Sequence, residues 1–242
     1  MEPEQYLDHL ARDSDALADA AGTAGSQTPV PTCPDWTVED LVRHCAGGDL
    51  WARIIVETGS RESAPRDLPA DAPTGAELVP YFRDGARQLV AALAAKDPTA
   101  SVWTFSPADR TARFWYRRRA HETAVHRYDA ESAAGAPGPL DAELAVDGID
   151  EFLTVFLPRL AAGLAEDMAS IHLHCTDTEG EWLVRREGDD VVVTREHAKG
   201  DVAARGAASD LMLFLWGRVP ADRLQVFGAA DALDRFRAAI KV

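Results

Sequence analysis

The sequence predicts an α+β protein in which a helical bundle over residues 1–160 precedes a small α+β domain over residues 165–242. Apolar residues recur at helical spacing in five segments up to about residue 160. Short segments that alternate or are rich in β-branched residues follow. With 46% hydrophobic and 27% charged residues, the chain has the composition of an ordinary globular protein.

The expected helices of the bundle are separated by segments rich in glycine and proline. Thr37 is the predicted N-cap of the second helix, because Asp40 stands three residues later, as in a capping box. Pro80 lies near the start of the third helix and predicts a kink or a later onset there. The five helices are expected over residues 3–22, 37–59, 74–96, 113–134 and 140–157.

The second domain begins with strand-like patterns. The letters EGDD between two of these segments are typical of a hairpin turn. Two short helical segments, 209–218 and 229–240, enclose a further short strand at 224–228. Strands are therefore expected within residues 170–177, 181–187, 189–196, 201–206 and 224–228.

The charge and composition exclude several classes of protein. A net charge of −15 argues against a nucleic-acid partner, which requires a basic surface. No apolar run approaches the roughly 20 residues of a membrane span, and the first residues, MEPEQYLDHLARD, lack an apolar secretory segment. Three cysteines are too few for a disulfide framework, so we expect a cytoplasmic protein with free thiols. The sequence does not specify an oligomeric state.

The fourth helix carries the letters AHETAVHRYDAE, which contain a candidate metal site. Glu122 and His126 are four residues apart and lie about 40° from each other on one helix face. His121 points about 140° away from His126 and is excluded from the same site. Asp129 lies on the same stripe, either as a partner for an imidazole N–H or as a further ligand. Taken alone, such a pair is also common as a surface ion pair.

A third ligand is available on the second helix, where His44 is the candidate. Gly47 and Gly48 follow it, and each costs about 1 kcal/mol relative to alanine inside a helix. Their presence predicts a close approach by a packed helix or by a ligand. A helical histidine is otherwise more often an ordinary core or surface residue.

Two longer motifs, PVPTCPDWTVEDLVRHCAGGDLWA (29–52) and FWYRRRAHETAVHRYDAE (114–131), resemble the mycothiol-dependent maleylpyruvate isomerase family. The resemblance implies a DinB-like four-helix bundle that binds zinc through His44, Glu122 and His126. It also implies a small second domain over about 170–242, whose active-site arginine is matched by Arg218. The alternative role of Arg218 is to complement the dipole at a helix C-terminus.

Two further arginines are candidates for cofactor binding. Arg118 and Arg119 lie one turn before Glu122 on its stripe, where either could hold a carboxylate of the substrate or of the thiol. The competing interpretation is a solvated charge run.

Three protein ligands leave zinc an open position, which is typical of a catalytic site. A small thiol, mycothiol according to the resemblance, would bind there as the nucleophilic thiolate. The expected reaction with a small electrophilic substrate is either isomerisation or S-transfer, both of which occur among proteins with this scaffold. The alternative is a non-catalytic metal- or ligand-binding protein, such as a sensor or carrier. A hydrolase with metal-bound water ranks third.

The motif IHLHC also contains potential metal ligands. Strand alternation places His172 and His174 on one face and Cys175 on the other, so the motif is interpreted as structural. Nothing near Cys33 or Cys45 marks either one as a thiol with a lowered pKa.

Overall fold

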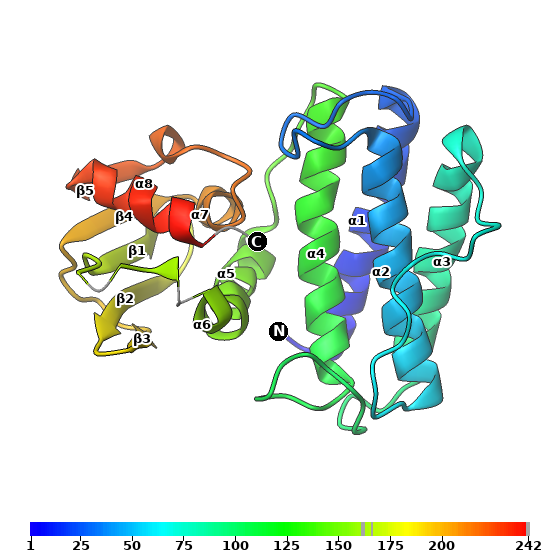
Figure 1. Cartoon of the computed structure of the whole chain (residues 1–242), viewed down its shortest axis with the longest axis horizontal. Coiled ribbons are helices and arrows are strands. Elements are labelled where there is room, and N and C mark those ends of the chain that lie inside the picture. The colour runs from blue at the N-terminus through cyan, green and yellow to red at the C-terminus, as the bar shows by residue number, and fades with distance from the viewer. Residues whose placement is uncertain (161–162, 166, 241–242) are drawn as a thin grey trace. The chain divides into compact units, whose positions relative to one another are not determined.

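The computed structural model describes residues 1–160, 163–165 and 167–240 and divides the chain into two compact units, Met1–Gly138 and Pro139–Val242. The first unit is a helical bundle and the second is a small α+β domain, which confirms the predicted fold class (Figure 1). Within the described residues, no helix is both long enough and apolar enough to cross a membrane.

Four long helices form the first unit, with α1 packed on α3 and α4, and α2 packed on the same two helices. A short 3₁₀ helix, Gly75–Glu77, leads directly into α3. The long helices are α1 (Pro3–Ala24), α2 (Val38–Thr58), α3 (Leu78–Ala94) and α4 (Arg113–Ala133).

Helices α2 and α3 begin where the capping box at Thr37 and the proline at position 80 predict. The backbone N–H of Asp40 donates to Oγ1 of Thr37, and the Asp40 carboxylate accepts the Thr37 backbone N–H at 2.9 Å, completing the capping box. The Thr37 hydroxyl also donates to the Asp40 carboxylate at 2.6 Å, and this bond, followed by the one from the Thr37 backbone N–H, lowers the pKa of Asp40. Helix α3 begins four residues later than the first expected position. Pro80 therefore falls in its first turn, where a missing N–H breaks no intrahelical bond.

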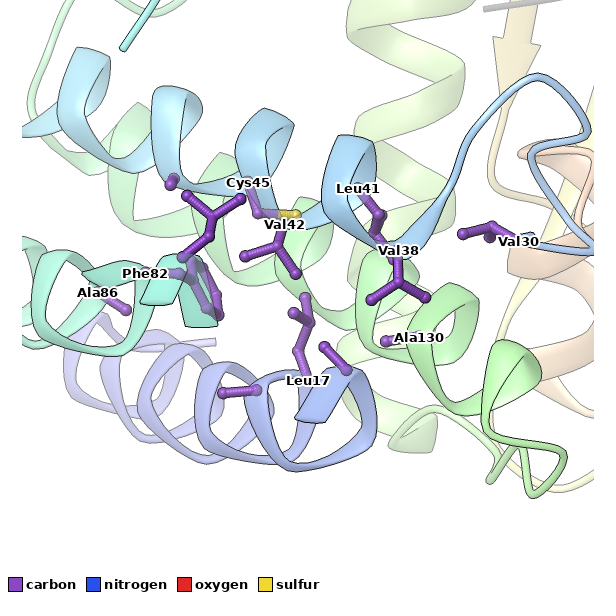
Figure 2. Close-up of a cluster of buried hydrophobic side chains, with 13 residues drawn as sticks. Leu17, Val30, Val38, Leu41, Val42, Cys45, Phe82, Ala86 and Ala130 are labelled. Atoms are coloured by element: carbon purple, nitrogen blue, oxygen red, sulfur yellow. The ribbon is translucent and has the colours of Figure 1, made fainter. Parts of the chain in front are cut away.

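One apolar cluster joins all four helices (Figure 2). Leu17 of α1, Leu41 of α2 and Phe82 of α3 are fully buried in it. Cys45 and Ala130 also belong to the cluster, and each follows directly on a residue of the candidate site. The cluster therefore fixes α2 and α4 at the level of that site. Burial raises the pKa of Cys45 well above its ordinary value, so its thiol is not activated.

The second unit contains a five-stranded sheet in the order β3-β2-β1-β4-β5. Only β1 and β4 are parallel neighbours; the other pairs are antiparallel. The predicted hairpin joins β2 to β3, with Gly188 at a φ of 61° in its turn. The strands are β1 (Ile171–Cys175), β2 (Glu181–Glu187), β3 (Asp190–Thr194), β4 (Val202–Gly206) and β5 (Gln225–Gly228).

Helices α7 (Ala208–Leu215) and α8 (Ala230–Ala239) belong to this unit, as does a short 3₁₀ helix, Ala221–Arg223. Its first helix, α5 (Ala142–Glu151), continues through a π-helical segment, Phe152–Phe156, into α6 (Leu157–Leu160).

The division between the units differs from the expected boundary at residues 160–165, since α5 belongs to the second unit. It packs on α7, and Asp150 accepts a hydrogen bond from Nε1 of Trp182 at 2.7 Å. Helical periodicity reveals that α5 has an apolar face but not which core covers that face. Residues 161, 162 and 166, near the expected boundary, lie outside the described residues.

Candidate metal centre

Three side chains on two helices of the bundle bring potential metal ligands together. His44 on α2 and Glu122 and His126 on α4 each offer one ligand atom, and these atoms lie within 4.8 Å of one another. Nε2 of His44 is 3.2 Å from Oε1 of Glu122, and the two imidazole centroids are 5.0 Å apart. The structure thus brings the predicted ligands into one cluster.

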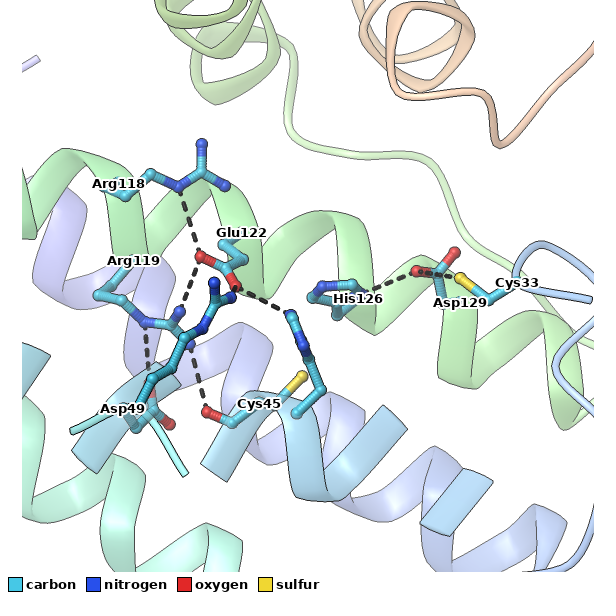
Figure 3. Close-up of polar contacts among 10 residues, drawn as sticks. Cys33, Cys45, Asp49, Arg118, Arg119, Glu122, His126 and Asp129 are labelled. Atoms are coloured by element: carbon cyan, nitrogen blue, oxygen red, sulfur yellow. Dashed lines mark hydrogen bonds and ion pairs between the residues drawn. The ribbon is translucent and has the colours of Figure 1, made fainter. Parts of the chain in front are cut away.

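Asp129 orients the ring of His126 (Figure 3). Its Oδ2 atom is 2.8 Å from Nδ1 of His126, which leaves Nε2 for the cluster. Asp129 is fully buried and also accepts hydrogen bonds from Oγ1 of Thr32 at 2.6 Å and from Sγ of Cys33 at 3.6 Å. Of the two roles expected for Asp129, the structure favours the imidazole partner. Carboxylate partners of this kind set the tautomer of ligating histidines.

The Glu122 carboxylate is surrounded by cations. Nη1 of Arg119 lies 2.8 Å and Nε of Arg118 3.4 Å from Oε2 of Glu122 (Figure 3). Burial alone would raise the pKa of Glu122, but Arg119, His44 and Arg118 hold that pKa well below its ordinary value. Glu122 is therefore ionised at neutral pH, as a metal ligand must be.

The Arg119 side chain is buried and forms ion pairs within the bundle. Its side chain is 1% exposed, and Nη2 forms an ion pair with Asp49 of α2 at 2.8 Å. Burial would lower the pKa of Arg119, yet Glu122 and Asp49 raise it above its ordinary value, so the guanidinium stays charged. These contacts occupy Arg119 in positioning Glu122. Its expected role in holding a carboxylate of the substrate or of the thiol stays a prediction.

The two adjacent glycines of α2 make room for these contacts. A Cβ on Gly48 would lie 2.5 Å from Nη1 of Arg119, and a Cβ on Gly47 would lie 2.7 Å from the carbonyl oxygen of Arg66. The predicted close approach is therefore made by a side chain of α4 and by the loop before α3.

Two further residues lie near the cluster, and of these Arg66 was not predicted as part of the site. The Trp36 ring lies 4.9 Å from the His44 ring and 6.1 Å from the His126 ring, centroid to centroid. Nη2 of Arg66 is 3.7 Å from Oε1 of Glu122, and its guanidinium lies over the Trp51 ring. Arg66 comes from an irregular loop, for which periodicity gives no signal.

Arg218 belongs to the second unit and follows α7. Its Nη1 donates to the carbonyl oxygen of Trp216 at 2.7 Å. Trp216 is the C-cap of α7, so this contact is of the kind expected of a cation at a helix end. A guanidinium has five N–H donors, and the contact remains compatible with binding a carboxylate.

The donor set of the cluster fits a divalent metal ion. Two imidazoles and one carboxylate are ordinary ligands of zinc and of neighbouring transition metals. The Asp129 carboxylate behind His126 is the outer partner that such sites typically have. His121 is excluded, as predicted: it is buried and meets the Tyr6 ring edge-on.

Both units match known families. Residues 7–131 match the mycothiol maleylpyruvate isomerase N-terminal domain, and residues 143–235 match the C-terminal domain of the same proteins. A crystal structure of a mycothiol-dependent maleylpyruvate isomerase is similar, with 15% identity over 93% of each chain and a TM-score of 0.64. A histidine-to-alanine mutant of such an isomerase gives 14% identity, the same coverage and the same TM-score. No curated protein matches the sequence.

Proposed function

The chain belongs to the mycothiol maleylpyruvate isomerase family, and on that basis we propose that it is a divalent-metal enzyme that uses mycothiol to isomerise maleylpyruvate or a similar electrophile. The observation that carries the proposal is the convergence of His44, Glu122 and His126 on one point, with Asp129 fixing the ring of His126.

The three clustered residues would hold the ion, for which zinc is the proposed identity. When bound, such an ion lowers the pKa of a thiol and favours the nucleophilic thiolate. The Trp36 ring lies beside both imidazole rings. Arg119 keeps Glu122 ionised and oriented toward His44.

Isomerisation requires a thiolate to add to the cis double bond, rotation about the resulting single bond, and expulsion of the same sulfur. The thiol is then regenerated, and no net bond is made. The developing negative charge on the substrate needs a cationic group beside the site. Arg66 and Arg118 are both near Glu122, and we assign them to the carboxylates of the substrate. S-transfer would use the same residues but leave the sulfur on the product.

Turnover of maleylpyruvate by the purified, zinc-loaded protein tests the proposal. We expect the trans isomer to form with mycothiol, and glutathione at equal concentration to support less than a tenth of that rate. His126→Ala should abolish turnover and metal binding at the bundle, whereas His9→Ala on α1 should change neither. A stable sulfur conjugate would instead indicate S-transfer. Metal binding without any thiol-dependent turnover would indicate a sensor or carrier and contradict the proposal.

We also propose a cytoplasmic location. All three cysteines are free thiols, as is usual for proteins in a reducing compartment.

A further inference from the structure

A second group of potential metal ligands lies in the small α+β unit. It consists of three imidazoles, those of His172, His174 and His197, arranged around the carboxylate of Glu181. One ligand atom from each of the four residues lies within 4.8 Å of the others. The three imidazole centroids are 5.8–6.4 Å apart.

Strand pairing explains most of this convergence. His174 of β1 is the register partner of Glu181 of β2, and Nδ1 of His174 lies 2.6 Å from Oε1 of Glu181. His172 is two residues earlier on β1 and therefore lies on the same face of the sheet. Its Nε2 atom is 3.4 Å from Oε2 of Glu181.

The fourth residue arrives from a different part of the chain. His197 lies in the segment between β3 and β4, which crosses from one edge of the sheet past β2 and β1. Its Nδ1 atom is 2.7 Å from Oε2 of Glu181, although the side chain is 84% exposed. An exposed side chain on a connecting segment is thus directed at the same carboxylate as two histidines of the sheet.

His172 provides an independent sign that this group binds a ligand. Its side chain is more than nine-tenths buried, and Nε2 has no hydrogen-bond partner. Buried polar atoms are nearly always hydrogen-bonded or coordinated. The unpartnered nitrogen is directed at Glu181.

We propose that His172, His174, Glu181 and His197 bind one divalent transition-metal ion of the zinc class. Three imidazoles and a carboxylate are borderline ligands suited to zinc. Four protein ligands fill a tetrahedral shell, which is typical of a structural site, whereas the three ligands of the bundle leave a position open. Because His197 lies in the segment at residues 195–200 and the other ligands lie on β1 and β2, the ion would hold this segment against the sheet. This replaces the interpretation of IHLHC as merely a structural strand motif.

Zinc titration of the untagged, chelator-stripped full-length protein tests the proposal independently of any activity. The starting variant is His44→Ala/His126→Ala, which removes the bundle site, and a chromophoric chelator reports the free zinc. We expect this variant to retain one equivalent of bound zinc. Adding His197→Ala or Glu181→Gln should weaken that binding at least tenfold, whereas adding His9→Ala should leave it unchanged. Absence of the retained equivalent, or its persistence after both ligand substitutions, would overturn the proposal.

The wild-type background provides a second comparison should the double variant fold poorly. His197 is exposed, so His197→Ala is expected to fold normally and to lose one equivalent relative to the wild type. Hydrogen exchange then tests the structural role: zinc should slow exchange over residues 195–200 in the wild type and not in His197→Ala. Equal exchange with and without zinc in the wild type would overturn that role. The bundle site is tested separately, by the equivalent of zinc that His126→Ala removes. If the wild type bound no such equivalent, the proposed function would fail without affecting the second site.

Discussion

Asp129 lies 2.8 Å from Nδ1 of His126, on the side of the ring away from Glu122 (Figure 3). A carboxylate can only accept at this contact, so Nδ1 carries the proton and Nε2 presents its lone pair to the cluster. The single pair thus fixes both the tautomer and the direction of one proposed ligand. The contact follows from the spacing on α4, because Asp129 is three residues beyond His126 and lies on the same helix face.

Asp129→Asn should therefore weaken metal binding at the bundle by about tenfold or more, the range usual for loss of such a partner. The amide keeps the shape of the side chain but removes the negative charge that favours the required tautomer. Zinc affinity measured in His197→Ala, which lacks the second proposed site, gives the comparison. Glu131→Gln on the same helix, where Glu131 pairs with Arg127, is the matched control. Equal affinities for Asp129→Asn and its parent would contradict the assigned role.

Gly48→Ala should damage the site although alanine is the better helix former. The added methyl group would lie 2.5 Å from Nη1 of Arg119, the atom that contacts Glu122. We expect zinc affinity at the bundle to fall about tenfold and thermal stability to fall as well. Gly85→Ala in α3 is the control, because among the described residues no heavy atom outside the adjacent residues and the surrounding helix backbone lies within 4 Å of the new Cβ.

Alanine loses less backbone conformational entropy than glycine when the helix forms, so Gly85→Ala should be stabilised by up to about 1 kcal/mol. Calorimetry and metal titration of the two variants check this pair of predictions. A stabilised Gly48→Ala variant with unchanged zinc affinity would show that Arg119 can move without affecting Glu122.

Variants of the ion pair between Arg119 and Asp49 should affect folding stability and metal binding differently. Arg119→Met leaves Asp49 buried without its cation, which costs about 3–5 kcal/mol of unfolding free energy. The double variant Asp49→Leu/Arg119→Met removes both charges and should regain most of that loss. Zinc affinity should stay low in both variants, because neither positions Glu122. Denaturant unfolding and metal titration measure the two effects, and full affinity in the double variant would exclude a role for Arg119 at the site.

Helical spacing accounts for much of what could be predicted in the bundle. Glu122, His126 and Asp129 share one face of α4 because they are separated by three or four residues. The capping box at Thr37 fixed the start of α2 and with it the position of His44. That α2 and α4 pack together at this level depends on tertiary contacts, and only the family resemblance anticipated it.

The group in the second unit illustrates what local patterns leave out. Alternation placed His172 and His174 on one face, but the register that sets Glu181 opposite His174 depends on the pairing of β1 with β2. His197 lies in a connecting segment without periodicity, and only the path of that segment across the sheet brings it to Glu181. Arg66 was not predicted for the same reason.

Arg218 has two roles to be distinguished. Its contact with the Trp216 carbonyl fits a cation at the end of α7, where Arg237 also donates to the carbonyl of Phe214 at 2.9 Å. Burial, followed by repulsion from Arg218, lowers the pKa of Arg237. A helix end needs only a positive charge, worth about 0.3–1 kcal/mol. A clamp for a carboxylate needs the planar fork that lysine lacks.

Arg218→Lys should therefore fold normally, bind metal as the wild type does, and turn over a carboxylate-bearing substrate about tenfold more slowly or worse. The loss corresponds to one charge-assisted hydrogen bond of about 1.5–3 kcal/mol. Arg237→Lys is the matched control, since it preserves a charge at the same helix end and should leave kcat/KM unchanged. The decisive comparison is kcat/KM for the two variants at equal metal content. An Arg218→Lys variant as active as Arg237→Lys would assign Arg218 to the helix end alone, because charge without geometry would then suffice.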